Sequence, residues 1–303
     1  MDGKFTIITT ISQTNIAFST FNKMKGIFLL GFIILAGSCK HVKQTDDSLY
    51  SRHLQRSVKL HVIHTPPPSD RSLFNLLILN DGQDMEKMRV KEAMDSLYKK
   101  GKILPLVIIG VEAGDRLQEF GVSEKPDYLG RGSRAGFYDA FINNELYPYA
   151  KKESGTRKFQ SVVIAGCSMG GLSAFDFAWN HPDKISKVGV FSGAFWWRDK
   201  DSDDSSYSDE KNRIMFSKLK ASRKKPGLEY WFYAGAAEEK GDRDKDGIID
   251  VIDDTKDIIG LLEKKNVVGS DGIVYKELPT GIHNYSSWSE VFPEFLVWAF
   301  GAR

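Results

Sequence analysis

Residues 162–174 read VVIAGCSMGGLSA, an apolar run followed by Gly-x-Ser-x-Gly and then by small residues. The run has the length and composition of a buried strand, whereas Leu172, Ala174 and the residues after them suit a buried helix. The sequence therefore places Ser168 on a sharp turn from strand to helix, with its side chain above the sheet edge. Because N–H groups at a helix start stabilise negative charge, we expect the Met169 N–H to face an oxyanion.

A histidine near the C-terminus complements this serine. A serine hydroxyl is a poor nucleophile until a base accepts its proton, and an acid must hold that base in the right tautomer. Of the six histidines, His283 is the best candidate base, because it lies between the last predicted strand and the last predicted helix, in a loop that begins near Gly281. The alternatives are an ordinary glycine-rich turn at Ser168 and a solvated or packed side chain at His283.

Composition and pattern favour one globular α/β domain. The chain has 303 residues, is 41% hydrophobic and carries 42 basic against 40 acidic side chains, a balance that offers no footprint for nucleic acid. Predicted strands alternate with predicted helices, which favours a single doubly wound, mostly parallel sheet flanked by helices over residues 51–303. The strands are predicted at 57–63, 73–79, 104–111, 162–167, 188–191, 230–233 and 272–278, and the helices at 85–100, 137–152 and 287–300, besides the one that follows Ser168.

The N-terminal region has the pattern of an export signal. Two lysines flank Met24, an apolar run occupies 26–35, and Ala36-Gly37-Ser38 precede Cys39. Small residues that end in a cysteine resemble the lipobox of bacterial lipoproteins, which implies acylation of Cys39 and a membrane anchor in the cell envelope. On this interpretation Met24 is the start, residues 1–23 are an upstream extension, 40–50 are a polar linker, and Cys167 has no disulfide partner. A plain secretory signal or an uncleaved anchor is the alternative.

Several further motifs accompany the serine and the histidine: Asp81-Gly82-Gln83, Arg116-x-x-Glu119, His181-Pro182-Asp183, Ser192-Gly-Ala-Phe-Trp-Trp197 and Gly281-Ile282-His283. With these motifs the chain resembles the esterase D-like family of α/β-hydrolases. The resemblance runs from about residue 51 to 300, and the Asp-Gly-Gln and Ser-x-x-Phe-Trp-Trp motifs are most similar to the siderophore-esterase branch. The family also includes feruloyl and acetyl esterases, S-formylglutathione hydrolases and mycolyltransferases.

The resemblance implies roles for two further positions. The loop after the second predicted strand supplies the other oxyanion N–H in such hydrolases, which points to the backbone of Gln83, with an ordinary Asp-Gly turn as the alternative. The family's acid lies three residues beyond a glycine, which points to Glu238, with Glu239 and Asp242 as close rivals. Some relatives work with a Ser–His pair alone.

An acidic loop follows this candidate acid. Residues 242–253 fit the spacing of a calcium loop, with side-chain oxygens at positions 1, 3, 5, 9 and 12, glycine at 6 and a backbone carbonyl at 7. The predicted Ca²⁺ ligands are Asp242, Asp244, Asp246, Ile248, Asp250 and Asp253. A solvated acidic turn is the alternative. We hypothesise that a structural Ca²⁺ stiffens the segment that supports His283, and we expect no organic cofactor.

These observations predict a serine carboxylic-ester hydrolase that works through an acyl-enzyme, with an acyl, feruloyl or siderophore ester as substrate. Phe195, Trp196 and Trp197 are candidates to line an acyl or aromatic pocket, and packing in the core is the alternative. An acyltransferase of the same fold and a catalytically idle surface binding module are the other readings of the same residues.

Overall fold

The computed structural model describes residues 41–223, 227–267 and 272–302, which form an α/β domain around one sheet. The sheet has eight strands in the order β1-β2-β4-β3-β5-β6-β7-β8. Strands β1 and β2 pair antiparallel, as do β2 and β4, and the other neighbours pair parallel. The strands are β1 Lys43–Ser51, β2 Arg56–His64, β3 Asn75–Asn80, β4 Leu106–Val111, β5 Val162–Cys167, β6 Lys187–Phe191, β7 Glu229–Gly235 and β8 Ile273–Leu278.

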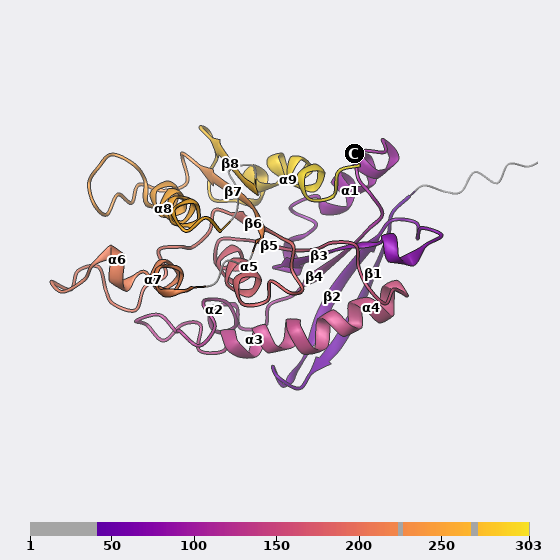
Figure 1. The fold of residues 1–303 in the computed structure, drawn as a ribbon, viewed down its shortest axis with the longest axis horizontal. Coiled ribbons are helices and arrows are strands. Elements are labelled where there is room, and N and C mark those ends of the chain that lie inside the picture. The colour runs from indigo at the N-terminus through magenta and orange to yellow at the C-terminus, as the bar shows by residue number, and fades with distance from the viewer. Residues whose placement is uncertain (1–40, 224–226, 268–271, 303) are drawn as a thin grey trace, which may run out of the picture. The chain divides into compact units, whose positions relative to one another are not determined.

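Helices cover both faces of this sheet (Figure 1). The helices α1 and α9 pack on one face, and α3, α4, α5, α7 and α8 lie on the other. A π turn at residues 142–146 joins α3 to α4. The helices are α1 Val90–Lys99, α2 Arg116–Glu119, α3 Ala135–Phe141, α4 Tyr147–Ser154, α5 Met169–Asn180, α6 Asp209–Asn212, α7 Ile214–Ala221, α8 Asp250–Lys264 and α9 Tyr285–Phe300.

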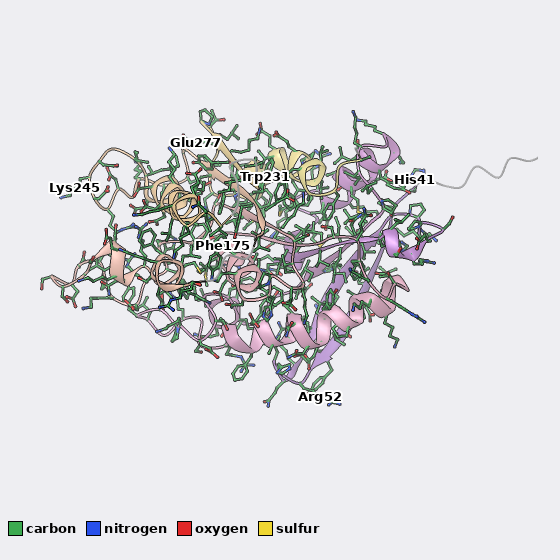
Figure 2. The ribbon with its side chains drawn as sticks, viewed as in Figure 1. His41, Arg52, Phe175, Trp231, Lys245 and Glu277 are labelled. Atoms are coloured by element: carbon green, nitrogen blue, oxygen red, sulfur yellow. The ribbon has the colours of Figure 1, made fainter. Side chains whose placement is uncertain are left out.

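The core lies on both sides of the central strands. All six residues of β3, β4 and β5 are buried, as expected of parallel strands that helices cover on both faces. Figure 2 labels one residue from each side: Phe175 of α5 belongs to one core cluster and Trp231 of β7 to the other, and each is 1% exposed. No helix in the described ranges is long and apolar enough to cross a membrane.

The structure corrects parts of the predicted organisation. Residues 43–50, which we predicted to be a linker, belong to β1, an edge strand that pairs with β2 from Lys43 to Ser51. Helix α8 was not predicted, because its first turn coincides with the end of the acidic loop. The helix expected from residue 85 begins at Val90, since residues 82–84 form a 3-10 turn and Arg89 has a left-handed φ of 53°.

Strand direction gathers the candidate site at one edge of the sheet. The parallel strands β3, β5, β6, β7 and β8 share one direction, so their carboxyl ends lie along the same edge. Asp81, Ser168 and Ser192 directly follow β3, β5 and β6, and the loops after β7 and β8 carry Glu238 and His283. The topology therefore places all five near one another, although they span about two hundred positions of the chain.

Candidate active site

Ser168 lies on a strained turn between β5 and α5. Its φ is 54° and its ψ is −123°, a conformation that L-residues rarely adopt. A Cβ at Gly166 would lie 2.4 Å from the backbone of Gly170, so this close crossing of strand and helix requires glycine. The Ser168 N–H donates to the Phe191 carbonyl at 2.8 Å, which ties the turn to β6. Strain held in place by the surrounding fold is typical of a functional residue.

His283 is paired with a buried carboxylate. Its Nδ1 lies 2.8 Å from Oε2 of Glu238, whose side chain is 1% exposed, whereas the histidine side chain is 42% exposed. Because a carboxylate accepts, Nδ1 carries the proton in this pair, and Nε2 is the nitrogen left for another partner. This arrangement suits a general base.

The two rivals of Glu238 have other partners. The Glu239 carboxylate accepts the Val251 N–H at 2.8 Å, and burial raises the pKa of its carboxyl group. The Asp242 carboxylate accepts the N–H groups of Asp246 and Gly247 within the acidic loop. The structure thus brings Glu238 to His283 and holds the other two acids elsewhere.

Ser192 is part of the same cluster and was not predicted as a site residue. Its hydroxyl donates to Oε1 of Glu238 at 2.5 Å and accepts the indole N–H of Trp288 at 2.8 Å. The Gly235 N–H also donates to Oε1, at 2.7 Å. Ser192 is the first residue of one of the family motifs, but the motif gives no contacts for its hydroxyl, because the partners lie 46 and 96 positions away.

The candidate oxyanion donors, the backbone N–H groups of Gln83 and Met169, lie just after β3 and β5. Gln83 belongs to a 3-10 turn that packs closely on β4: a Cβ at Gly82 would lie 2.5 Å from the Gly110 backbone. Met169 is the first residue of α5. Within the described residues, neither the Gln83 nor the Met169 backbone N–H donates a hydrogen bond to the protein. Both donors are thus available to an anion.

Charged side chains hold the Gln83 turn from two sides. Arg116 donates twice to the Asp81 carboxylate, at 2.8 and 3.0 Å. On the other side, the Tyr285 hydroxyl donates to Asp84 at 2.6 Å, which connects this turn to the loop that carries His283. The Gln83 side-chain amide bridges Asp81 and Asp84 at 2.9 and 3.3 Å. These bonds fix the turn relative to the histidine loop.

The aromatic residues after β6 correct our pocket prediction. Phe195 is 1% exposed and Trp197 0%, and both belong to the larger core cluster. Trp197 packs against the backbones of Gly121 and Gly132, where an added Cβ would lie 3.1 and 3.0 Å from its ring. These two side chains are therefore part of the core, and only Trp196 of the three is partly exposed.

The acidic loop brings three predicted ligands together. Carboxylate oxygens of Asp242, Asp244 and Asp246 lie within 4.8 Å of one another, and Gly247 has a φ of 92° at the sharp turn. Asp250 instead accepts the Arg243 N–H at 2.9 Å and pairs with its guanidinium at 3.2 Å. Burial raises the pKa of Asp253 to about 6, helped by the charges of Asp257, Asp244, Asp254 and Asp246, in decreasing order.

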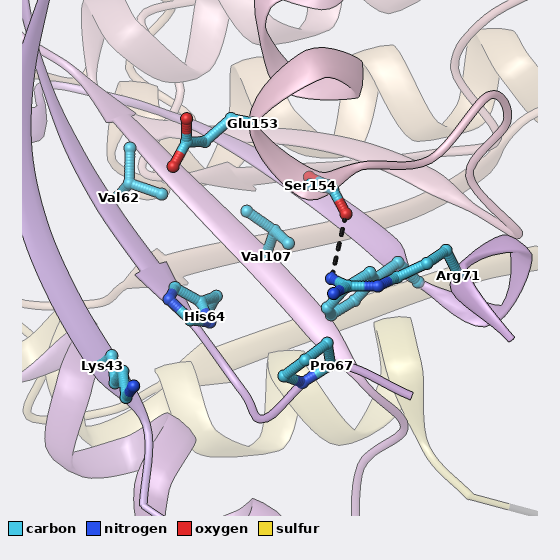
Figure 3. A pocket seen from close by; sticks show the side chains of 9 residues that line it. Lys43, Val62, His64, Pro67, Arg71, Val107, Glu153 and Ser154 are labelled. Carbon is cyan, nitrogen blue, oxygen red and sulfur yellow. Dashed lines mark hydrogen bonds between the residues drawn. The ribbon is translucent and has the colours of Figure 1, made fainter. Parts of the chain in front are cut away.

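A separate cavity of about 250 Å³ lies away from these residues (Figure 3). Val107, at the amino end of β4, and His64, at the end of the antiparallel β2, pair with each other and line it. Arg71 also lines the cavity, and its guanidinium donates to the Ser154 carbonyl at 3.3 Å. The cavity is thus at the edge of the sheet opposite the Glu238–His283 pair, and it has no part in that site.

The fold and the site together define an α/β-hydrolase, with a strained serine turn, a Glu–His pair and two available N–H donors at the carboxyl edge of the sheet. A family model described as "Putative esterase" matches residues 51–299, and the chain belongs to this family. The membership places it among the esterases.

Relatives and solved structures agree with this family. The chain is 25% identical over 244 residues to the uncharacterized protein YbbA of Bacillus subtilis, covering 78% of this chain and 90% of the relative. It is 29% identical over 147 residues to the iron(III) salmochelin esterase of Escherichia coli, covering 47% of this chain and 33% of that protein.

Among solved structures, the enterobactin esterase of Shigella flexneri matches with a TM-score of 0.64 at 20% identity, covering 85% of this chain and 59% of that one. A ferulic acid esterase matches with a TM-score of 0.62 at 16% identity, covering 86% and 98%. The chain thus spans about three fifths of the enterobactin esterase. At these identities the structures establish the shared fold alone.

Proposed function

We propose that the protein is a serine carboxylic-ester hydrolase. The observation that carries this proposal is the 2.8 Å contact between His283 and the buried Glu238, at the sheet edge where Ser168 sits on its strained turn. Nε2 of His283 accepts the Ser168 proton as Oγ attacks the ester carbonyl, while the Nδ1 proton stays on Nδ1 and faces Glu238.

The remaining steps use the same groups. The tetrahedral intermediate places its oxygen near the Gln83 and Met169 N–H groups, which stabilise the negative charge. His283 then returns the proton to the leaving alcohol, and the acyl group stays on Ser168. Water, deprotonated by the same imidazole, releases the acid and restores the serine.

Labelling with a fluorophosphonate probe tests the nucleophile. We expect the wild type to be labelled and Ser168→Ala to lose both labelling and ester turnover. Ser205→Ala, which alters an exposed serine in the loop between β6 and α6, is the matched control and should behave as the wild type. An unlabelled, inactive wild type would favour the idle binding module.

The names of the relatives support a choice of candidate substrates. Their names include a salmochelin esterase, an enterobactin esterase and a ferulic acid esterase, so we propose siderophore esters and feruloyl or acyl esters of carbohydrates as candidates. A panel of catecholate, feruloyl, acetyl-sugar and p-nitrophenyl esters distinguishes them by kcat/KM. The same panel with a sugar acceptor added detects acyl transfer as an ester product.

We further propose that the acidic loop binds one structural Ca²⁺. Two observations support this proposal: the carboxylates of Asp242, Asp244 and Asp246 converge, and glycine occupies the sharp turn between them and Ile248. Asp242, Asp244, Asp246, the Ile248 carbonyl, Asp250 and Asp253 are the proposed ligands. Calorimetric titration of the chelator-treated protein tests this, and Asp244→Asn should weaken the binding while Asp201→Asn, in another exposed loop, should not.

Export and lipid anchoring remain proposals, since Cys39 and the apolar run before it lie outside the described residues. The motif at 36–39 supports them. Metabolic labelling with a radioactive fatty acid should modify the wild type and spare Cys39→Ser. Cell fractionation should then find the wild type with membranes and the variant in the soluble fraction.

A further inference from the structure

The hydroxyl of Ser192 lies between an indole and the acid of the proposed triad. It is 2.8 Å from Nε1 of Trp288 and 2.5 Å from Oε1 of Glu238. An indole N–H can only donate, and a carboxylate can only accept. The direction of both bonds is therefore determined: Trp288 donates to Ser192, and the single hydroxyl proton of Ser192 points to Glu238.

This arrangement determines which carboxylate oxygen serves the histidine. Oε1 of Glu238 receives two donors, the Ser192 hydroxyl and the Gly235 N–H, and Oε2 is left for Nδ1 of His283. Trp288 also contacts the imidazole directly, edge to face, with ring centroids 5.2 Å apart at 81°. One indole of α9 thus packs on the base with its ring and reaches the acid through Ser192.

The backbone at Ser192 indicates that its side chain matters. Its φ is 51°, in the left-handed region, where an L-residue is less stable than glycine. The serine is also 1% exposed and Trp288 5% exposed, so neither polar group has ready access to water. A strained, buried serine whose hydroxyl contacts the acid of a proposed triad points to a requirement for that hydroxyl.

We propose that Ser192 and Trp288 are positioning residues for catalysis, which hold Glu238 so that His283 keeps its working tautomer and orientation. This inference rests on the proposed hydrolase function. No proton crosses Ser192: the Ser168 proton moves to Nε2 of His283 and onward to the leaving alcohol, and the Ser192 proton stays in its bond to Glu238. Its role is to stabilise the carboxylate as an anion while imidazolium forms.

Ser192→Gly and Trp288→Phe test this role. Glycine removes the hydroxyl and suits the left-handed backbone, and phenylalanine removes the N–H and keeps a packed ring. We expect each variant to lower kcat on the order of tenfold, the effect of one lost hydrogen bond, with little change in KM. The acidic limb of the kcat/KM profile should move to higher pH, because a carboxylate with fewer donors holds protons more strongly.

Trp298→Phe is the matched control, because it alters a tryptophan of the same helix whose ring contacts Trp231 and Phe295 instead. It should leave kcat and the pH profile unchanged. The double variant of Ser192 and Trp288 should lose little more activity than either single variant, since the two residues act through one bond to Glu238. Additive losses would contradict this shared route.

Proton NMR separates this inference from the hydrolase proposal. The Nδ1 proton of His283 gives a downfield signal when it is bonded to Glu238, and the Ser168→Ala protein, which does not turn over, can be used to observe it. Adding Ser192→Gly should shift or broaden this signal, even if wild-type protein proves unreactive toward the fluorophosphonate. If the signal and the pH profile both stay as they are, whatever happens to thermal stability, Ser192 is merely structural and the inference is overturned.

Discussion

Two adjacent glutamates, Glu238 and Glu239, have different partners. The Glu238 carboxylate is buried and contacts His283 and Ser192, whereas the Glu239 carboxylate accepts the first-turn N–H of Val251 in α8. The glycine that ends β7 and the turn after it make the difference, since they direct one side chain to the sheet edge and the next toward α8. Neighbouring residues of one type thus offer a direct test of the acid.

Glu238→Gln should lower kcat by roughly 10²–10⁴, because an amide can present its NH₂ to Nδ1 and favour the wrong tautomer. Glu239→Gln should retain most of the activity and lose a little thermal stability. Steady-state kinetics on a p-nitrophenyl ester measure both variants. Equal losses of kcat in the two variants would mean that Glu238 is not the acid that orients His283.

The sequence could predict some of these residues. Ser168 stands in a motif whose glycines have a steric purpose, and His283 lies between the last predicted strand and the last predicted helix. Glu238 follows from the family resemblance, with Glu239 and Asp242 left open. Only contacts across strands could decide among the three acids. Ser192 and Trp288 could not be predicted as a pair, because a hydrogen bond over 96 positions leaves no local pattern.

The edge strand β1 is an element that the sequence pattern could not predict either. Most of its residues are exposed, so it lacks the alternation of apolar and polar residues that reveals a half-buried strand. It is held in the sheet by its antiparallel pairing with β2. Side chains add one clamp: His61 lies between Asp46 of β1 at 2.8 Å and Glu112 beyond β4 at 2.9 Å. An imidazole that faces two carboxylates binds both only when it is protonated.

This clamp should make the stability of the domain depend on pH. Burial lowers the pKa of His61, but the bonds and charges of Asp46 and Glu112 outweigh it, and the net shift is upward. A raised folded pKa means that the stabilisation is complete below the unfolded value, about 6.5, and is lost as the pH rises through the folded value. We expect about 1 kcal/mol or less, as for a partly exposed ion pair.

Thermal unfolding of His61→Gln measures this effect. The gap in Tm between wild type and variant should be largest near pH 6 and should narrow by pH 9. His53→Gln is the control, since that ring lies near the Asn144 amide and has no carboxylate partner among the contacts of the described residues. A gap that stays constant across this pH range would rule out the clamp.

Across the domain, one buried carboxylate connects the segments that surround the acidic loop. Asp254 of α8 is 0% exposed and accepts from Arg213 at 2.6 Å and from Arg243 of the loop at 2.7 Å. Arg243 also bonds to Asp209 of α6 at 2.9 Å. The doubly wound sheet itself was predicted from the alternation of apolar runs, but this network, which unites residues about forty positions apart, depends on tertiary packing.

Asp254→Asn should destabilise the fold far more than Asp257→Asn, although Arg213 contacts both aspartates. Asp254 is fully buried, so its loss leaves two guanidinium groups without their shared anion, and we expect a cost of about 3 kcal/mol. The Asp257 side chain is 40% exposed, and water can replace it at a cost of at most about 1 kcal/mol. Urea unfolding gives both values.

The same pair of variants tests whether the network supports the acidic loop. Because Arg243 lies between Asp242 and Asp244 in the chain, Asp254→Asn should also weaken the proposed Ca²⁺ binding, whereas Asp257→Asn should leave it nearly unchanged. Similar effects of the two substitutions on Ca²⁺ binding would mean that the network does not support the loop.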